Sequence, residues 1–432
     1  MELVRAIEMD TDEPINLLTA TAIEPVLRIA AGRLPVIAFV DANTERVLQE
    51  STLLPGRNQI IRGGITKAID YLNEQRSPHL LLVDISGVDL PLSQIHILAD
   101  VCEPGTRVIA IGDHNDVGLY RDLQEAGVSN YIVKPLTREL LAKALTPKSN
   151  SGDMGRAALK LGKMVSFVGA RGGVGTTTLT ANLAWYLANR QSRRVALVDL
   201  DLQNGGCGLL FNINPAPGLR DALANPLRLD SLLLDRIMTQ VGERLFVLSG
   251  EEPLHENVQF AVSAVDTLFS VLRSQFHYVI VDVPRLPLPP YRRALEIADR
   301  RIIVVDQTMH SMRDAVRLKR MLGDTGAAES SLAEPRSASD LRAERAEHRS
   351  MFVVNRVGET GHHGLSLKEV NNVLQVKPTS LIPFLPSLVT PAAHHATIAA
   401  SKRGKFANAV GTLALELSGR NKRRRWWWRA EK

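Results

Sequence analysis

Short apolar runs alternate with helical patterns along the first third of the chain. The β-branched runs PVIAFV, HLLLV, RVIAI and NYIV each have the length of a buried strand. Between them, stretches such as ITKAIDYLNEQ and LYRDLQEAG repeat apolar residues at helical spacing. Strands that alternate with helices are typical of a parallel sheet flanked by helices. The sequence therefore predicts an α/β domain over residues 1–147.

The pattern changes at TPKSNSGDMGR, which is rich in linker residues, and we place a linker at 148–163. A second strand–helix series predicts another α/β domain over 164–420, with a mainly parallel sheet. The polar, charged stretch 326–350 interrupts it and is expected to form a flexible insertion or a loose surface helix. Within the last helical stretch, Phe406, Val410, Leu413 and Leu417 are spaced to pack on this second domain.

Composition narrows the class of protein. No apolar run approaches the roughly 18 residues of a transmembrane helix, and the N-terminus lacks a signal-peptide pattern. Cys102 and Cys207 are the only cysteines and lie far apart, so neither a disulfide framework nor a cysteine metal site is expected. We therefore predict a soluble protein of a reducing compartment.

The net charge of +6 is concentrated at the C-terminus. Residues 402–432 contain ten Lys or Arg and two acids, which leaves 42 bases and 44 acids in the remainder of the chain. The body is thus nearly neutral, and no nucleic-acid-binding face is expected on it.

A glycine-rich turn follows the first strand of the second domain. FVGARGGVGTTTLTANLAW reads as a buried strand, a turn with Gly172, Gly173 and Gly175, and then a helix. Such a loop binds phosphate through its backbone N–H groups and the helix N-terminus. Thr177 has the place of the Mg²⁺-binding hydroxyl, whereas Thr176 replaces the lysine of the usual motif. The alternative is a plain glycine turn without a ligand.

Polar residues follow three later strands. Asp199 and Asp201 end the strand in VALVDLDLQNG, Asp282 ends FHYVIVDVP, and Asn355 ends MFVVNRV. The carboxyl ends of parallel strands meet at the edge where α/β sheets bind ligands. Each residue alone is equally compatible with a turn, but their order together predicts a nucleotide and Mg²⁺ site.

These motifs resemble the deviant Walker-A ATPases of the MinD and ParA superfamily. The loop of that superfamily reads KGGxGK followed by Ser or Thr, and RGGVGTT at Arg171–Thr177 aligns with it. The resemblance implies that ATP and Mg²⁺ are the cofactors and that Arg171 reaches the partner's phosphates in a homodimer. It also implies that Asp201 orients the attacking water, that Thr177, Asp199 and Asp282 serve the metal, and that Asn355 contacts adenine. The implied nucleotide-binding set is Arg171, Gly172, Gly173, Val174, Gly175, Thr176, Thr177, Thr178 and Asn355.

Thr176 departs from this family pattern. A threonine offers a hydroxyl but no charge to neutralise the transferring phosphate. Because the glycine amides, Thr177 and Arg171 remain, we expect ATP binding with slow hydrolysis at most. A scaffold that binds no nucleotide and keeps the loop for its shape is the alternative.

The resemblance extends to the TadZ/CpaE branch of pilus assembly proteins through GLRDAL, LRLDSLL, LFVLSGEEPL, ALEIADRRIIVVDQT and SMRDAVRL. Members of that branch join an atypical receiver domain to a MinD-like ATPase domain. The resemblance implies a localisation or assembly factor of a Tad (Flp, type IVb) pilus machine, with the other machine components as partners. It implies a cytoplasmic protein on the inner face of the cytoplasmic membrane, with the cell pole as one candidate position.

The first domain has part of the receiver chemistry. Asp84 has the phosphoacceptor position, and Asp41 and Lys134 match the acidic and switch positions. The second acid beside Asp41 is missing, and Gly112 replaces the hydroxyl residue. Few carboxylates hold a divalent ion weakly. The sequence therefore favours a flavodoxin-like pseudo-receiver for docking or dimerisation, with a phosphorylated response regulator and an ATPase output domain as the alternative.

Three further features carry weaker signals. The pairs His362–His363 and His394–His395 lack metal-ligand spacing and are expected in loops, and Asp306 is expected to be a strand-end turn residue. The tail 421–432 combines Trp426–Trp428 with a run of bases. That composition favours an anionic membrane surface. A protein partner, an idle tail and single-stranded nucleic acid are the alternatives, nucleic acid the least favoured.

Overall fold

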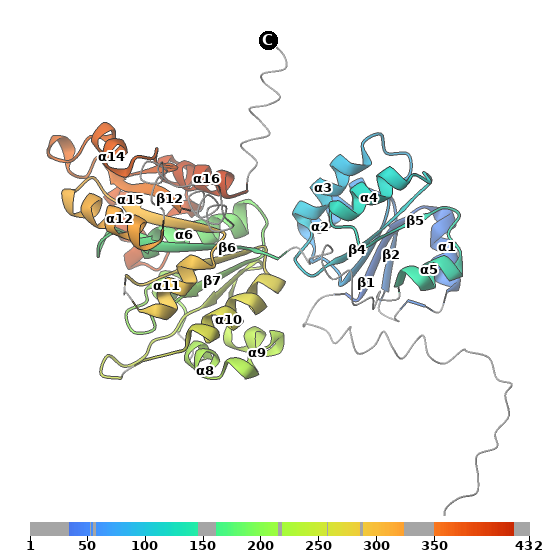
Figure 1. Cartoon of the computed structure of the whole chain (residues 1–432), viewed down its shortest axis with the longest axis horizontal. Helices are drawn as coiled ribbons and strands as arrows, with labels where there is room; N and C mark the ends of the chain where they lie inside the picture. The colour runs from blue at the N-terminus through green and yellow to red at the C-terminus, as the bar shows by residue number, and fades with distance from the viewer. Residues whose placement is uncertain are drawn as a thin grey trace, which may run out of the picture. The chain divides into compact units, whose positions relative to one another are not determined.

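The computed structural model describes residues 34–418, except 52, 55–57, 146–160, 215–217, 257, 286–287 and 324–349. The chain divides into two compact units, the first containing β1 to α5 and the second β6 to α16 (Figure 1). Most of the predicted linker and insertion, and all of the tail 421–432, lie outside the described residues. Within the described part of the chain, no helix has the length and apolarity needed to cross a bilayer.

The first unit is a five-stranded parallel sheet in the order β2-β1-β3-β4-β5. This is the flavodoxin-like strand order, which confirms the fold predicted for this part of the chain. Its strands are β1 (Val36–Val40), β2 (Asn58–Arg62), β3 (Leu80–Asp84), β4 (Arg107–Gly112) and β5 (Asn130–Val133). Its helices are α1 (Ala42–Glu50), α2 (Ile65–Glu74), α3 (Pro91–Val101), α4 (Val117–Glu125) and α5 (Arg138–Leu145).

Strand alternation gives the first unit its two cores. Ile37 and Phe39 of β1 point to the face covered by α2, α3 and α4, whereas Val36 and Val40 point to the face covered by α1 and α5. The edge strand β2 was not predicted, because its NQIIR sequence is largely exposed and lacks a continuous apolar run. Helices therefore cover both faces of the sheet (Figure 1).

The second unit is an eight-stranded sheet in the order β13-β12-β11-β6-β10-β7-β9-β8. Only the pairing of β8 with β9 is antiparallel among the described strands, which confirms the predicted mainly parallel sheet. Its strands are β6 (Lys163–Gly169), β7 (Val195–Asp199), β8 (Thr239–Val241), β9 (Leu245–Leu248), β10 (Tyr278–Asp282), β11 (Arg300–Val305), β12 (Ser350–Val357) and β13 (Ser380–Pro383).

Helices cover both faces of this sheet as well. The α-helices are α6 (Thr176–Arg190), α7 (Cys207–Leu210), α8 (Gly218–Ala224), α9 (Ser231–Ile237), α10 (Val262–Gln275), α11 (Pro289–Glu296), α12 (Met309–Met321), α14 (Leu367–Leu374), α15 (Pro386–His394) and α16 (Lys405–Ser418). The described residues of this unit also form the short 3-10 turns η1 (Pro226–Arg228), η2 (Gly361–His363) and η3 (Ala399–Ser401).

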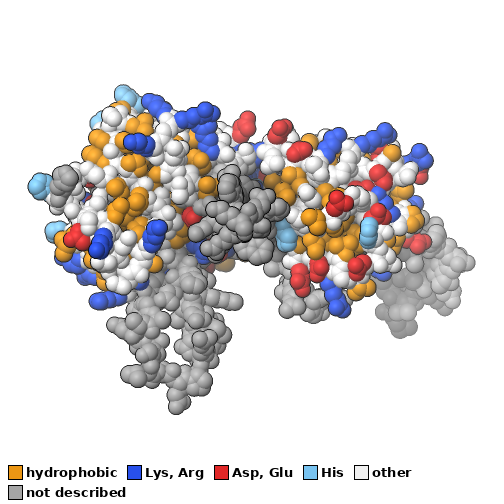
Figure 2. Space-filling model, turned by 90° about the horizontal axis from the view of Figure 1, so that it is seen from above, with side chains coloured by type: hydrophobic (Ala, Val, Ile, Leu, Met, Phe, Trp, Pro, Cys, Tyr) orange, Lys and Arg blue, Asp and Glu red, His pale blue; other side chains and the backbone are white. Residues whose placement is uncertain are grey.

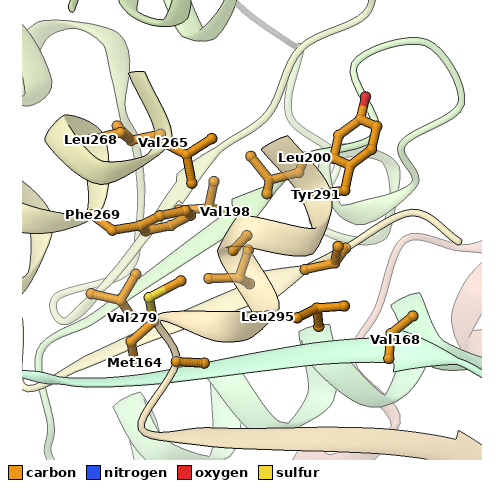
Figure 3. Packing of buried hydrophobic residues seen from close by; sticks show 14 of the residues in the cluster. Met164, Val168, Val198, Leu200, Val265, Leu268, Phe269, Val279, Tyr291 and Leu295 are labelled. Carbon is orange, nitrogen blue, oxygen red and sulfur yellow. The ribbon is translucent and has the colours of Figure 1, made fainter. Parts of the chain in front are cut away.

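The two faces of the larger sheet have separate hydrophobic cores. Met164 and Val168 of β6 pack with Phe269 and Leu268 of α10 on one face (Figure 3). The other face packs on α6, α7 and α16. There Phe406, Val410, Leu413 and Leu417 are all buried, which confirms the predicted packing of the last helix. Figure 2 shows acidic and basic side chains interspersed with hydrophobic ones on the displayed face of each unit.

Candidate nucleotide and metal site

The glycine-rich loop joins the central strand β6 to α6. Gly173 and Gly175 have φ angles of 73° and 87°, in the left-handed region that favours glycine. A Cβ on Gly175 would lie 2.5 Å from Nδ2 of Asn355, so this position also lacks space for a side chain. The side chain of Val174 is buried in the core beside α6, so that only the backbone of this residue is available to contact a ligand. The loop thus has the strand–turn–helix form that binds phosphate.

The predicted loop residues differ in their exposure. Gly172 and Gly173 are exposed, while Thr176, Thr177 and Thr178 are half-buried in the first turn of α6. Thr177 donates a side-chain hydrogen bond to Asp282. A Cβ on Gly169 would lie 2.6 Å from Oγ1 of Thr176, so the Thr176 hydroxyl lies against the end of β6. The structure therefore brings Thr177 to the carboxylate with which it was predicted to act.

Arg171 has a partner within its own chain. Its guanidinium donates to the carboxylate of Asp306 and, at 2.9 Å, to the carbonyl of Gly172. The Asp306 side chain is only 3% exposed and also accepts a hydrogen bond from Thr308 at 2.7 Å. Interpreting Asp306 as a simple turn residue was incomplete, because the strand order places the end of β11 beside the loop that follows β6.

Asp199 and Asp282 lie side by side at the ends of β7 and β10. They are Cα partners in the register of these two parallel strands, and both are buried. Burial raises the pKa of Asp199 to about 6, against hydrogen bonds from the N–H groups of Cys207 and Asp201. Burial and the charge of Asp199 raise the pKa of Asp282 to about 7. No base forms an ion pair with either carboxylate among the described residues.

Asp201 lies two residues beyond Asp199 and is half-buried. Its carboxylate accepts a hydrogen bond of 2.9 Å from the N–H of Asn204, while its own N–H donates to Asp199 at 3.1 Å. Gly205 packs against the same pair, because a Cβ there would lie 2.6 Å from Oδ2 of Asp199. The turn after β7 is thus folded closely over the buried carboxylate.

Asn355 lines a pocket of about 280 Å³ beside the first turn of α6. Its Nδ2 donates to the carbonyl of Val174 at 2.8 Å, and its Oδ1 accepts from the N–H of Arg356. The amide thus ties β12 to the glycine loop. Arg356 and Phe384 also line this pocket and were not singled out from the sequence. A pocket of this size beside a phosphate loop can hold a nucleotide base.

The receiver-like residues Asp41, Asp84 and Lys134 come together in the first unit. Nζ of Lys134 donates at 2.6 Å to both carboxylates. Burial opposes charge on Asp41, but hydrogen bonds from Lys134 and Thr44 lower its pKa to about 2. Burial likewise opposes charge on Lys134, yet the two carboxylates raise its pKa. The ammonium therefore supplies a cation for these acids within the chain.

The missing hydroxyl of the receiver pattern has a steric explanation. A Cβ on Gly112 would lie 2.4 Å from the hydroxyl oxygen of Tyr131, so the tyrosine ring fills that space. Its hydroxyl donates to the carbonyl of His114 at 2.9 Å. A pocket of about 250 Å³ lined by Asp41, Asp84 and Gly64 remains open beside the pair.

The CobQ/CobB/MinD/ParA nucleotide-binding domain family matches residues 165–398, more than half of the chain. The chain belongs to this family. The match includes the glycine loop, both buried carboxylates and Asn355. The first unit lies outside the matched residues.

The individual relatives have low sequence identity to this chain. An uncharacterized ATP-binding protein of Methanocaldococcus jannaschii is 29% identical over 36% of this chain, and the match covers 57% of that protein. The chain thus spans a little over half the length of that relative. The MinD protein of Pyrococcus horikoshii, solved with Mg-ADP, is 20% identical, with a TM-score of 0.48 over 60% of this chain and 96% of that one. A CpaE pilus assembly protein from Caulobacter crescentus is 33% identical, with a TM-score of 0.24 over 25% of this chain and 88% of that one.

Sequence reasoning missed two residues beside the site of this family member. Nη1 of Arg285 donates to the carbonyl of Ala170 at 2.7 Å and pairs with Asp314 at 2.8 Å. Cys207 opens α7, and its Sγ lies 3.9 Å from Oδ2 of Asp282. A single cysteine far from any other has no metal-ligand spacing, so no sequence pattern indicated that Cys207 lies beside the carboxylates that end β7 and β10.

Proposed function

We propose that this chain is an ATP-binding localisation or assembly factor of a Tad-type pilus machine, with weak or absent hydrolysis. The observation that supports ATP binding is the glycine loop of β6 and α6 beside the buried pair Asp199 and Asp282. The family supplies the nucleotide-binding domain. The pilus assignment is supported by the sequence resemblance to the TadZ/CpaE branch.

The residues present fit Mg²⁺ and a nucleotide. Two buried carboxylates that have no basic partner among the described residues favour a divalent cation, because an unpaired buried charge is costly. Thr177, Asp199 and Asp282 would serve the metal, and the loop amides from Gly172 to Thr178 would face the phosphates. Bound Mg²⁺ supplies positive charge to the phosphate oxygens. The pocket lined by Asn355 and Arg356 would take the base.

Slow hydrolysis follows from Thr176. A single charge-stabilising donor commonly contributes about 10²–10³ in rate, and the Thr176 side chain has no charge. Asp201 is the residue for orienting a water, because it lies at the turn after β7 with its carboxylate half-exposed. The expected enzyme is thus a slow or silent ATPase.

The remaining parts of the proposal concern partners and location. Arg171 would serve a homodimer by leaving Asp306 for the phosphates of a second copy. The first unit would dock other components of the pilus apparatus, and its Lys134 pairing disfavours phosphorylation at Asp84. The tail 421–432, outside the described residues, would hold the protein at the inner membrane surface.

Isothermal titration of the full-length chain tests ATP binding. We expect Mg–ATP to bind, and ATP in excess EDTA to bind much more weakly. Asp282→Asn should weaken Mg–ATP binding about tenfold or more, since a hydrogen bond or contact to a charged group is worth about 1.5–3 kcal/mol. Asp235→Asn on α9 is the matched control and should leave affinity unchanged. No heat at millimolar Mg–ATP would favour the nucleotide-free scaffold.

Deletion of the gene tests the pilus assignment separately. We expect loss of surface pili and of secreted pilin, restored by the wild-type gene. Normal piliation in the deletion strain would remove this assignment and leave ATP binding untouched. Phosphodonor treatment followed by mass spectrometry tests the response-regulator alternative, for which Asp84 would be modified.

A further inference from the structure

We infer that Cys207 makes the carboxylate pair of β7 and β10 a binding site for a thiophilic divalent cation such as Zn²⁺. The three ligands would be the carboxylates of Asp199 and Asp282 and the thiolate of Cys207. They come from the ends of two neighbouring strands and from the first residue of α7. This cation would bind without nucleotide.

The donor atoms already lie close to coordination distance. One donor atom from each of Asp199, Cys207 and Asp282 lies within 4.8 Å of the other two. Sγ of Cys207 lies 3.9 Å from Oδ2 of Asp282. Donors of one tetrahedral zinc ion lie roughly 3.3–3.6 Å apart, given bonds of about 2.0 Å to oxygen and 2.3 Å to sulfur. Side-chain rotations that move these atoms by about 1 Å would therefore close the site.

The surroundings of the pair also favour a bound cation. Asp199 is 0% exposed and Asp282 is 7% exposed, and among the described residues each accepts hydrogen bonds only from neutral groups. No lysine or arginine pairs with them in the part of the chain that the structure describes. Buried carboxylates are ordinarily paired or bound to metal, since burial of an unpaired charge is strongly unfavourable.

The backbone holds Cys207 in place for this role. The N–H of Cys207 donates to Oδ2 of Asp199 at 3.0 Å, so the residue is tied to the first carboxylate. Its side chain is completely buried beside the second carboxylate. Gly205, two residues earlier, lets the turn pass within contact of Asp199. The thiol is thus directed toward both acids.

The donor set selects the class of cation. Mg²⁺ prefers oxygen ligands in octahedral geometry, whereas Zn²⁺ accepts sulfur, nitrogen and oxygen in a tetrahedral arrangement. Two carboxylates and one thiolate leave a fourth position for water, as in open zinc sites. Binding would release the thiol proton to solvent. Because the same carboxylates are proposed for Mg²⁺, bound Zn²⁺ would exclude Mg²⁺ from them.

Cobalt titration of the metal-free, nucleotide-free full-length protein tests this site. Co²⁺ replaces Zn²⁺ in such sites and gives a thiolate-to-metal charge-transfer absorption in the near ultraviolet. We expect this absorption to saturate at one Co²⁺ per chain, to disappear on adding Zn²⁺, and to persist in excess Mg²⁺. Cys207→Ser keeps both carboxylates and should abolish the absorption and weaken Zn²⁺ binding about tenfold or more.

Cys102→Ser is the matched control, because Cys102 is the chain's other cysteine and belongs to the first unit. We expect it to retain the full absorption. Absorption that survives Cys207→Ser, or a folded wild-type protein that shows none, would overturn the proposal. Neither result depends on ATP: a protein can bind Mg–ATP without the cobalt signal, or give the signal without binding ATP. Failure of the metal site and failure of the proposed function are therefore distinguishable.

Discussion

Each unit of this chain brings two acidic side chains together at the carboxyl ends of parallel strands, but among the described residues only the first unit supplies a basic side chain for them. In the first unit, Lys134 bridges Asp41 and Asp84 at 2.6 Å to each. In the second unit, Asp199 and Asp282 have no base among the described residues. The corresponding edges of the two sheets therefore differ in their electrostatics: the acids are paired with a base in the first unit and have no such partner in the described part of the second.

The pKa values express this difference. The pKa of Asp41 is lowered to about 2, because Lys134 and Thr44 outweigh burial. The pKa values of Asp199 and Asp282 are raised to about 6 and 7, because burial, and for Asp282 also the charge of Asp199, outweighs the hydrogen bonds from neutral donors. The first unit is complete without an ion, whereas the second favours binding one. A resemblance in strand topology thus does not imply a shared need for metal.

Removal of Lys134 should have the largest effect on stability. Lys134→Met leaves the 7%-exposed side chain of Asp84 without its cation, so we expect a loss of about 2–4 kcal/mol. Urea unfolding followed by circular dichroism measures the loss. Lys143→Met, on the exposed face of α5, is the control and should change stability by less than about 0.5 kcal/mol. Equal stability of the two variants would show that the bridge is not needed.

Removal of the Arg171 side chain should have the next largest effect on stability. Arg171→Ala leaves the buried carboxylate of Asp306 with Thr308 as its remaining side-chain donor, and we expect a loss of about 1–3 kcal/mol. The double variant Arg171→Ala/Asp306→Asn should recover part of that loss, as thermal unfolding would show. A single variant as stable as wild type contradicts the ion pair's structural role.

The same variants address the dimer. With Mg–ATP, sedimentation analysis should find dimers in Asp306→Asn, which keeps Arg171, and none in Arg171→Ala. Unchanged dimerisation of Arg171→Ala would mean that Arg171 acts only within its own chain.

Thr176→Lys should have a moderate effect on Mg–ATP affinity. The substitution gives the second unit a lysine ammonium, the kind of charge that Lys134 already provides in the first. An ammonium at the phosphates should raise Mg–ATP affinity about tenfold, or roughly 1.4 kcal/mol. Isothermal titration measures this change, and Thr412→Lys on the exposed side of α16 is the control. Unaltered affinity would indicate that another base, such as Arg285, already supplies the charge.

The smallest effect should be the pH dependence of the metal-free protein. Asp199 and Asp282 have folded-state pKa values above the ordinary 3.8, so the folded state binds more protons than the unfolded state between about pH 4 and 7. Their contribution to stability is complete below pH 4 and is lost as the pH rises through 6 and 7. In EDTA, we expect the melting temperature to fall by about 2–4 °C from pH 6 to pH 8.

Asp282→Asn should flatten this profile, whereas Asp41 should contribute nothing to it. The pKa of Asp41 is lowered, so its stabilising contribution disappears only as the pH falls through about 2. A profile with the opposite slope in wild type, unchanged by Asp282→Asn, would contradict the raised pKa values.

Sequence patterns predicted the features that depend on a single strand or helix and the turn that follows it. The glycine loop follows a buried strand, and Asp199 and Asp282 each end an apolar run, so their common edge could be inferred from the amino-acid sequence alone. The pairing of Arg171 with Asp306 could not, because it depends on which strands are neighbours. Cys207 was missed for the same reason: it opens α7, and its thiol lies beside Asp282 at the end of β10, which is distant in sequence. Strand β2 was missed because an exposed edge strand needs no apolar pattern.

The register of β7 and β10 has a mechanical consequence. Asp199 and Asp282 are opposite one another, and neighbouring strands are spaced roughly 4.8 Å apart by their backbone hydrogen bonds. The backbones of the two acids cannot separate without breaking the ladder that joins β10 to both β7 and β6, so only side-chain rotation can change the distance between the carboxylates. The sheet therefore fixes the distance between the two backbones. Which cation binds between the carboxylates is decided by the ion's radius and ligand preference, and not by rearrangement of the backbone.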